Sequence, residues 1–176
     1  EQPRIHVVPD MDNQPKYKTQ SRNMMFADRR AMRPPVAGTV ARGTTIGNPS
    51  LTSGKLGDDW VETIPREIDG ASLQRGRERY DVFCSPCHGL AGFGDGMVSK
   101  RADELLEGTW TPPTSFHSDL QRERPVGHIF NTISNGIRNM PAYGSQIPVE
   151  DRWAIVAYVR ALQRSQNATV DDVPSD

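Results

Sequence analysis

The chain has 176 residues, of which 35% are hydrophobic and 24% are charged, and its 21 Lys and Arg residues nearly balance 22 Asp and Glu. This composition excludes a fully disordered chain, and the lack of a basic excess argues against a nucleic-acid-binding protein. The longest uninterrupted apolar run, Trp153 to Val159, is seven residues. A membrane-spanning helix needs about 20, so no transmembrane segment is expected.

Residues 1–70 have the composition of an extended arm. Seven prolines interrupt them, and no helical or alternating apolar pattern persists. Between Lys16 and Arg42, seven basic residues stand against one acid, Asp28, which gives a local net charge of +6. A solvated linker is the simplest interpretation. Apolar residues interspersed among these charges, such as Tyr17 and Phe26, favour instead an arm that docks on partner subunits, because a pure linker has no use for them.

Helical periodicity begins at residue 71 and predicts a domain over residues 71–166. Small or apolar residues first recur every three or four positions, at Leu73, Gly76, Tyr80 and Phe83. Asp69 or Ser72 can cap this helix. A glycine-rich loop over 89–96 precedes a short helix over 98–107. Another helix is expected over 126–135, and Pro148 begins the last one. Residues 167–176 form an acidic tail.

Both cysteines lie within four residues, in Cys84-Ser85-Pro86-Cys87, and His88 follows at once. Two thiols at this spacing can add to the vinyl groups of a haem, and the adjacent histidine can bind its iron. The motif therefore predicts one covalent haem c, attached through Cys84 and Cys87, with His88 as an axial ligand. A structural disulfide is disfavoured, because closing so short a loop gains little chain entropy.

Two alternatives use the same cysteines. A thioredoxin-like dithiol needs strands and helices alternating around it, but the segment before Cys84 has a helical pattern. A zinc site would take a further ligand from His6, His117 or His128, and these positions lack the paired spacing of a zinc finger. Haem attachment accounts for the motif better than either.

The loop from Gly136 to Gly144 is expected to supply the second axial ligand, Met140. Pro141 restrains Met140 toward an extended backbone, and the loop is held between two predicted helices. Simple packing is the alternative role for this side chain, and His117 and His128 are the competing ligands. Ligation by His and Met fills both faces of the iron and raises its reduction potential, which suits electron transfer. We identify no catalytic residues.

The second ring nitrogen of His88 needs an acceptor, because that bond fixes the orientation and basicity of an axial imidazole. Pro112 and Pro113 are the candidates, since they offer free carbonyls in a rigid extended loop. The alternative is that the two prolines only end the preceding helix.

Together these residues resemble the class I monohaem cytochromes c over residues 71–166. The resemblance rests on Gly76, Tyr80, Cys84 to Gly89, Gly94-Asp95-Gly96, Pro112-Pro113, Met140-Pro141 and the helix over 153–162. It implies an all-α domain of four or five helices around one haem. The first and last helices of such a domain cross beside the haem, with Gly76 allowing close approach near Tyr158.

Residues 11–17 and 32–43 of the arm resemble, more narrowly, the monohaem cytochrome c subunit (ActE) of bacterial alternative complex III. That resemblance implies a quinol-oxidising complex at the periplasmic face of the cytoplasmic membrane, with this subunit peripheral or lipid-anchored. The implied partners are other subunits, including a multihaem cytochrome c, and a terminal oxidase or soluble electron carrier. A start at Glu1 fits an exported, processed chain and equally a trimmed one.

Three alternative functions stay open at this point. The first is a cytochrome subunit of another respiratory or sulfur-oxidising assembly. The second is a free soluble carrier, although the long arm argues against it. The third is a five-coordinate haem enzyme or sensor, which requires that Met140 does not bind the iron.

Overall fold

The protein is represented by a computed structural model that describes residues 7–8, 10–11, 14–40, 42, 47–105 and 110–172. The chain divides into two units, residues 1–44 and 45–176, which are described separately. Helices dominate the second unit, and this confirms the predicted all-α, class I cytochrome c fold. Its elements are α1 (Pro49–Ser53), β1 (Lys55–Leu56), β2 (Asp59–Trp60), α2 (Gly70–Phe83), α3 (Ser85–His88), α4 (Met97–Glu104), α5 (Asp119–Arg122), α6 (Val126–Asn135), α7 (Val149–Gln166) and the 3-10 helix η1 (Val170–Asp172).

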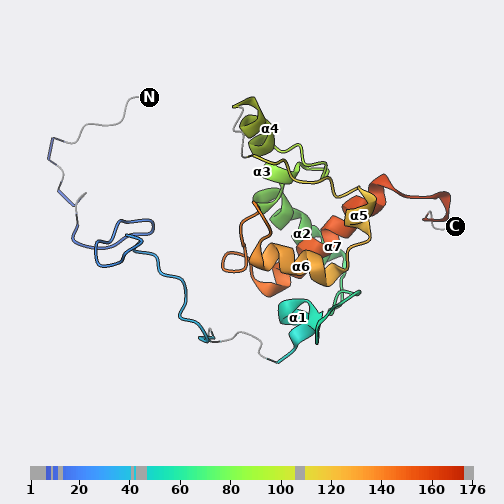
Figure 1. The fold of residues 1–176 in the computed structure, drawn as a ribbon, viewed down its shortest axis with the longest axis horizontal. Helices are drawn as coiled ribbons and strands as arrows, with labels where there is room; N and C mark the ends of the chain where they lie inside the picture. The colour runs from blue at the N-terminus through green and yellow to red at the C-terminus, as the bar shows by residue number, and fades with distance from the viewer. Residues whose placement is uncertain are drawn as a thin grey trace. The chain divides into compact units, whose positions relative to one another are not determined.

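Helices α2 and α7 cross at the centre of this unit (Figure 1). The Asp69 carboxylate begins α2 by accepting a hydrogen bond from the Ser72 amide at 2.7 Å, which confirms the predicted cap. Gly76 marks the crossing, because a Cβ there would lie 2.1 Å from the carbonyl oxygen of Ala154 and 3.2 Å from Cβ of Tyr158. Only glycine permits this approach, so the predicted contact near Tyr158 is confirmed.

Large aromatic side chains fill the core between α2, α6 and α7. Tyr80, Phe130 and Trp153 are fully buried. The rings of Phe130 and Trp153 stack with their centroids 4.3 Å apart, and the ring centroids of Tyr80 and Tyr158 lie 5.3 Å apart. Burial on this scale makes α6 and α7 a rigid support for the loop that joins them.

A segment that we call the strap, residues 47–69, also belongs to the second unit, and α1 lies beside α6 (Figure 1). The Trp153 indole donates to the carbonyl of Leu51 at 2.7 Å. The amide of Gly127 donates to Val61 at 2.9 Å, and the amide of Val61 donates to Gly54 at 3.0 Å. The predicted arm boundary at residue 70 is therefore too late, since the folded unit already includes the strap.

The first unit contains a closed turn, which corrects the expectation of an extended arm. Residues 18–33, which we call the arm hairpin, are held by an isolated antiparallel bridge between Arg22 and Arg30. The Asn23 amide donates to Arg29 at 2.9 Å, and the Ala31 amide donates to Ser21 at 3.0 Å. Positive φ angles at Gln20 and Arg29, rather than at glycines, let the chain reverse, so composition does not reveal the turn.

The C-terminal ends of α4 and α7 can be compared with the helix ends predicted from the sequence. Helix α4 runs from Met97 to Glu104, whereas the helix was predicted over 98–107, and residues 106–107 lie outside the described residues. Helix α7 ends at Gln166, at the predicted end of the domain. None of the helices described has both the length and the apolar character needed to cross a bilayer.

Candidate haem site

Cys84, Cys87 and His88 share one helical turn. The Cys84 amide donates to Tyr80 at 2.8 Å and ends α2, while the amides of Cys87 and His88 donate to the Cys84 carbonyl at 3.1 and 2.8 Å. Residues three and four apart lie on the same face of a helix, so this turn directs both thiols and the imidazole to one side. Both cysteines are free thiols and half-buried.

Burial controls the protonation of these three groups. It raises the pKa of Cys84 to about 12, raises the pKa of Cys87, and lowers the pKa of His88 to about 4. At neutral pH the thiols are protonated and the imidazole is neutral, which is its metal-binding form. A thioredoxin-type dithiol needs a lowered thiol pKa, so the raised values argue against that alternative.

The glycine-rich loop folds back tightly over α3. The Gly94 amide donates to His88 at 2.8 Å, and the Gly96 amide donates to Cys87 at 3.1 Å. A Cβ at Gly96 would lie 2.3 Å from the Pro86 carbonyl oxygen, and one at Gly94 would lie 2.1 Å from that of Pro113. These glycines are therefore required for the loop to pack against the motif and against the Pro112-Pro113 segment.

The His88 ring stacks on Phe116, with centroids 4.7 Å apart and planes 25° from parallel. Its Nδ1 atom is buried and has no hydrogen-bond partner among the residues described. The bond predicted to Pro112 or Pro113 is thus not formed in this structure, and the Pro113 carbonyl lies against Gly94 instead. A buried ring nitrogen still calls for an acceptor.

The loop between α6 and α7 brings Met140 into a tight turn. The backbones of Met140 and Ile137 exchange two hydrogen bonds, of 2.9 and 3.0 Å, and the Tyr143 amide donates to Ile133 at 2.9 Å. Tyr143 also packs edge-on against Phe83, one residue before Cys84, at 6.2 Å between centroids. Burial raises the pKa of Tyr143, and the thiols of Cys87 and Cys84 raise it further. The loop that carries Met140 is therefore brought beside the cysteines.

The competing histidines are held by other groups. Nε2 of His117 lies 2.7 Å from the carbonyl oxygen of Ala91, and its ring lies 4.6 Å from that of Phe93. Nε2 of His128 lies 2.7 Å from a guanidinium nitrogen of Arg124, and its ring packs edge-on against Trp60. His6 lies outside the described residues. The structure thus gives both described histidines local partners, which favours Met140 over either of them.

Two aromatic residues of the site were not predicted from the sequence. Phe116 stacks on His88, and Tyr143 joins the Met140 loop to α2. For Tyr143 the available signal was its position, because it follows Met140 by three residues.

A family model described as "Cytochrome C oxidase, cbb3-type, subunit III" matches residues 71–159, half of the chain. The chain belongs to this cytochrome c family. The match spans Cys84, Cys87, His88 and Met140, so the family domain contains the whole candidate site.

Two curated relatives extend the comparison. The chain is 24% identical over 154 residues to the cytochrome bc1 complex cytochrome c subunit of Corynebacterium diphtheriae, covering 82% of this chain and 50% of that protein. It is 26% identical over 157 residues to the quinohemoprotein alcohol dehydrogenase ADH IIB of Pseudomonas putida, covering 86% of this chain and 18% of that protein. The chain thus spans half or less of these relatives.

Among solved structures, the chain is similar to the reducing HAO-like protein complex of Kuenenia stuttgartiensis. The sequences are 20% identical, the TM-score is 0.46, and the match covers 64% of this chain and 54% of the other.

A cytochrome c domain implies haem c, and the residues present fit that group. Cys84 and Cys87 are free thiols in the helical turn that also bears a neutral His88, and Gly96 packs closely against the backbone of Pro86 and Cys87. Nδ1 of His88, within the motif, is buried and has no hydrogen-bond partner among the described residues. Bound there, haem supplies one-electron redox chemistry.

Proposed function

We propose that this protein is a monohaem electron-transfer subunit of a membrane quinol-oxidising respiratory complex, alternative complex III. In this proposal Cys84 and Cys87 carry the single haem, and His88 and Met140 are the axial ligands. Electrons arrive from the haems of a partner multihaem cytochrome c and leave to a terminal oxidase or a soluble carrier. The subunit works at the periplasmic face of the membrane, held by its arm or by a lipid anchor.

The observation that carries the electron-transfer role is the placement of the Met140 loop beside the cysteines through Tyr143 and Phe83. With His and Met both bound, no position on the metal is left for a substrate. The protein's own contribution is then to exclude water around His88, through its stack on Phe116, and to hold Met140 in a loop supported by the buried faces of α6 and α7.

The role within a complex is supported by two further observations. One curated relative is itself named as a subunit of a respiratory complex. The arm also carries exposed apolar side chains among its cations, which a free soluble carrier does not need. Purifying the chain from solubilised membranes and testing the preparation for quinol oxidation tests this part; a preparation without that activity would exclude alternative complex III.

We also propose that Nδ1 of His88 donates to the carbonyl of Pro112 or Pro113 in the haem-bound protein. Support comes from the residues on either side of these prolines. Pro113 already contacts Gly94, and Phe116 is stacked on the imidazole. A bond of this kind would raise the basicity of the ligand and lower the reduction potential.

Replacing Met140 by His tests the ligand assignment. We expect Met140→His to keep the haem attached, since the thioether links lie elsewhere, and to lower the reduction potential, because imidazole stabilises ferric iron better than a thioether does. Potentiometry and the sulfur-to-iron absorption band measure this. Met97→His is the control, since Met97 lies on α4 and is 75% exposed. An unchanged potential and band in Met140→His would exclude Met140 as a ligand.

A further inference from the structure

We propose that the arm hairpin, residues 18–33, is a preformed docking element that inserts Met24 and Met25 into an apolar pocket within an acidic surface of a partner protein subunit. The inference rests on the proposed function only in taking that partner from the membrane complex. It assigns to a few residues a role that the arm as a whole was expected to play.

The hairpin is ordered by its own contacts. Side-chain hydrogen bonds add to those of its backbone: Oδ1 of Asn23 accepts from the Met25 amide at 2.9 Å, and the hydroxyl of Ser21 accepts from the Lys18 amide at 2.8 Å. Asn23 is buried although no helix packs on it. An element already closed in this way loses less conformational entropy on binding than an extended arm would.

The turn of the hairpin presents apolar side chains to solvent. Met24 is 69% exposed and Met25 is 82% exposed. Phe26 is only 38% exposed, because the guanidinium of Arg33 covers its ring at 4.2 Å. The two adjacent methionines are therefore the most prominent apolar side chains of the hairpin, and flexible thioethers suit insertion into a partner's pocket.

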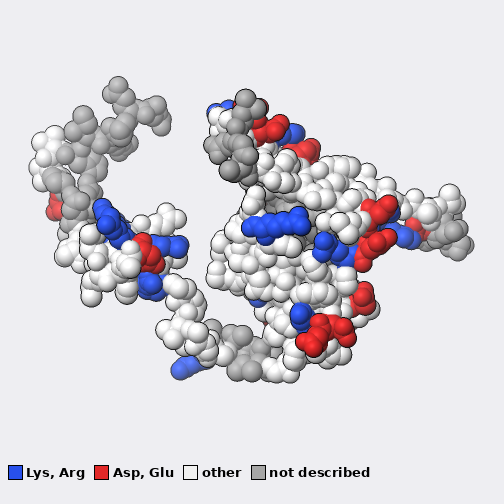
Figure 2. All heavy atoms as spheres, in the orientation of Figure 1, with Lys and Arg blue, Asp and Glu red and all other residues white. Residues whose placement is uncertain are grey.

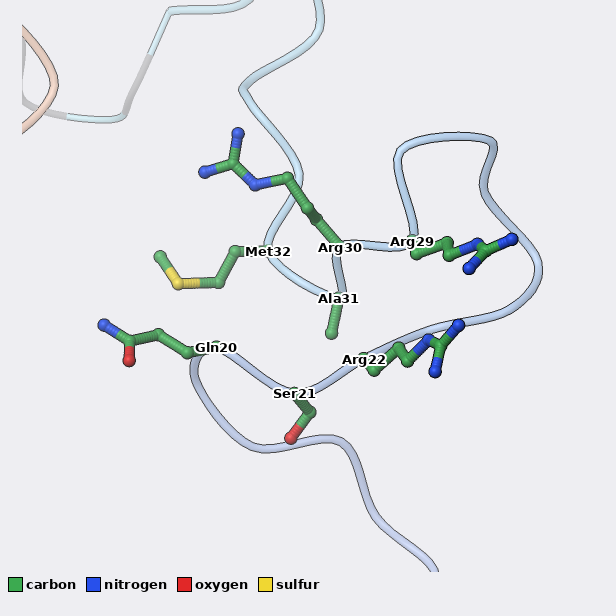
Figure 3. A pocket seen from close by; sticks show the side chains of 7 residues that line it. All are labelled: Gln20, Ser21, Arg22, Arg29, Arg30, Ala31 and Met32. Atoms are coloured by element: carbon green, nitrogen blue, oxygen red, sulfur yellow. The ribbon is translucent and has the colours of Figure 1, made fainter.

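Cations surround these methionines. Arg33 is paired with Asp28 at 2.5 Å, whereas Arg22, Arg29 and Arg30 have no ion pair with any residue described. Figure 2 shows much more blue than red over the hairpin. In Figure 3 the side chains of Arg22 and Arg29 extend together to one side, while Arg30 extends to the other beside Met32, lining a shallow pocket. Charge complementarity thus requires an acidic partner surface.

The residue types favour a protein partner over a lipid surface. Met and Arg are enriched in the cores of protein interfaces, where Lys is depleted, and the hairpin holds four Arg but only one Lys. Arginines also bind carboxylates in bidentate fashion. Elements that lie in a membrane interface rely on Trp, Phe and Leu. The hairpin has only Phe26 of these, and that ring is covered by Arg33.

Matched variants of the 176-residue cytochrome chain test the proposal. Met24→Ser/Met25→Ser removes the apolar anchors, and Met11→Ser/Met97→Ser, at residues 69% and 75% exposed, is the control. Arg22→Gln/Arg29→Gln/Arg30→Gln removes the free cations, and Arg77→Gln/Arg101→Gln changes exposed arginines of the haem domain. Each chain is tagged, recovered from solubilised membranes, and assayed for attached haem and for co-purifying protein subunits.

We expect both hairpin variants to keep their haem and to lose co-purifying subunits at least tenfold, while both controls stay within twofold of the unaltered chain. Retention by the hairpin variants, or recovery of the unaltered chain without other proteins, would overturn the inference. So would binding to vesicles of anionic phospholipid that the same variants abolish, because it would identify a lipid surface.

The experiment separates this inference from the proposed function. A co-purifying complex that depends on Met24 and Met25 but oxidises no quinol leaves the hairpin's role standing and removes the assignment to alternative complex III. A quinol-oxidising complex that retains the hairpin variants fully supports the assignment to alternative complex III and removes the proposed role of the hairpin.

Discussion

The strap and the arm hairpin look alike in sequence and are stabilised in opposite ways. Both are polar, lack helical periodicity and lie within the predicted arm. The strap is held by distant residues, since its Leu51 carbonyl accepts from Trp153 and its Val61 pairs with Gly127. In the part of the chain that the structure describes, the hairpin is held by residues near it in the sequence, as in the bridge from Arg22 to Arg30. Composition therefore does not tell whether a polar segment belongs to a core or stands alone.

Two truncations give the largest expected difference. Removing residues 1–44 should leave the stability of the haem domain unchanged, whereas removing residues 1–70 should cost about 3–5 kcal/mol. The longer deletion uncovers Trp153, removes Leu51, Val61 and Ile64 from the core and takes away the Asp69 cap of α2, at roughly 1 kcal/mol for each half-buried side chain, for the Trp153 hydrogen bond and for the cap. Denaturant unfolding of the haem-loaded proteins measures the difference. Equal stability of the two truncated proteins would show that the strap belongs to the arm and not to the folded haem domain.

Gly127→Ala should separate the strap from α6 without removing any of it. A Cβ at residue 127 would lie 2.0 Å from the carbonyl oxygen of Gly54, so the backbones must move apart. We expect a loss of about 2–4 kcal/mol, which exceeds the ~1 kcal/mol that Ala gains over Gly inside a helix. Gly70→Ala is the control, because nothing lies within 4 Å of that position. Thermal unfolding of both variants measures this loss, and equal unfolding midpoints would contradict the close contact between Gly127 and Gly54.

Trp153→Phe tests the one hydrogen bond that joins α7 to α1. The substitution keeps an aromatic ring stacked on Phe130 but leaves the half-buried Leu51 carbonyl without its donor. The expected cost is about 1–3 kcal/mol. In the protein lacking residues 1–70 the same substitution should cost less, because the acceptor is already gone. A cost that is the same in both backgrounds would mean that only packing of Trp153 matters.

Asp28→Asn is the smallest change and should affect the hairpin alone. A side-chain hydrogen bond from Arg33, aided by the Arg30 amide, lowers the pKa of Asp28 below its ordinary 3.8. The contribution of this pair to hairpin order is therefore present above pH 3.8 and is lost as the pH falls through the lowered pKa. Amide chemical shifts of Arg29 and Arg30 should follow that titration, while haem-domain unfolding stays unchanged. Shifts in Asp28→Asn identical to those of the unaltered chain at neutral pH would show that the pair does not order the turn.

The helices and the cysteine motif could be read from the sequence because each depends on residues close together in the chain. The Asp69 cap acts over three positions, Gly76 and Tyr80 lie one turn apart, and Cys84, Cys87 and His88 occupy a single turn. Local spacing alone places these groups on one face of a helix. The fold class, and the prediction that Cys84 and Cys87 attach the haem, follow from such spacing.

Only the tertiary structure decided where the folded unit begins and which residues surround the site. Trp153 and Leu51 are 102 positions apart, and Tyr143 reaches Phe83 across 60 residues of chain, so no local pattern relates them. The strap's apolar residues, Leu51, Val61 and Ile64, are too widely spaced to form a helical stripe, and they become a core only when α6 and α7 pack against them. Long-range packing and backbone hydrogen bonds, rather than periodicity, determine where the folded unit begins and which residues surround the site.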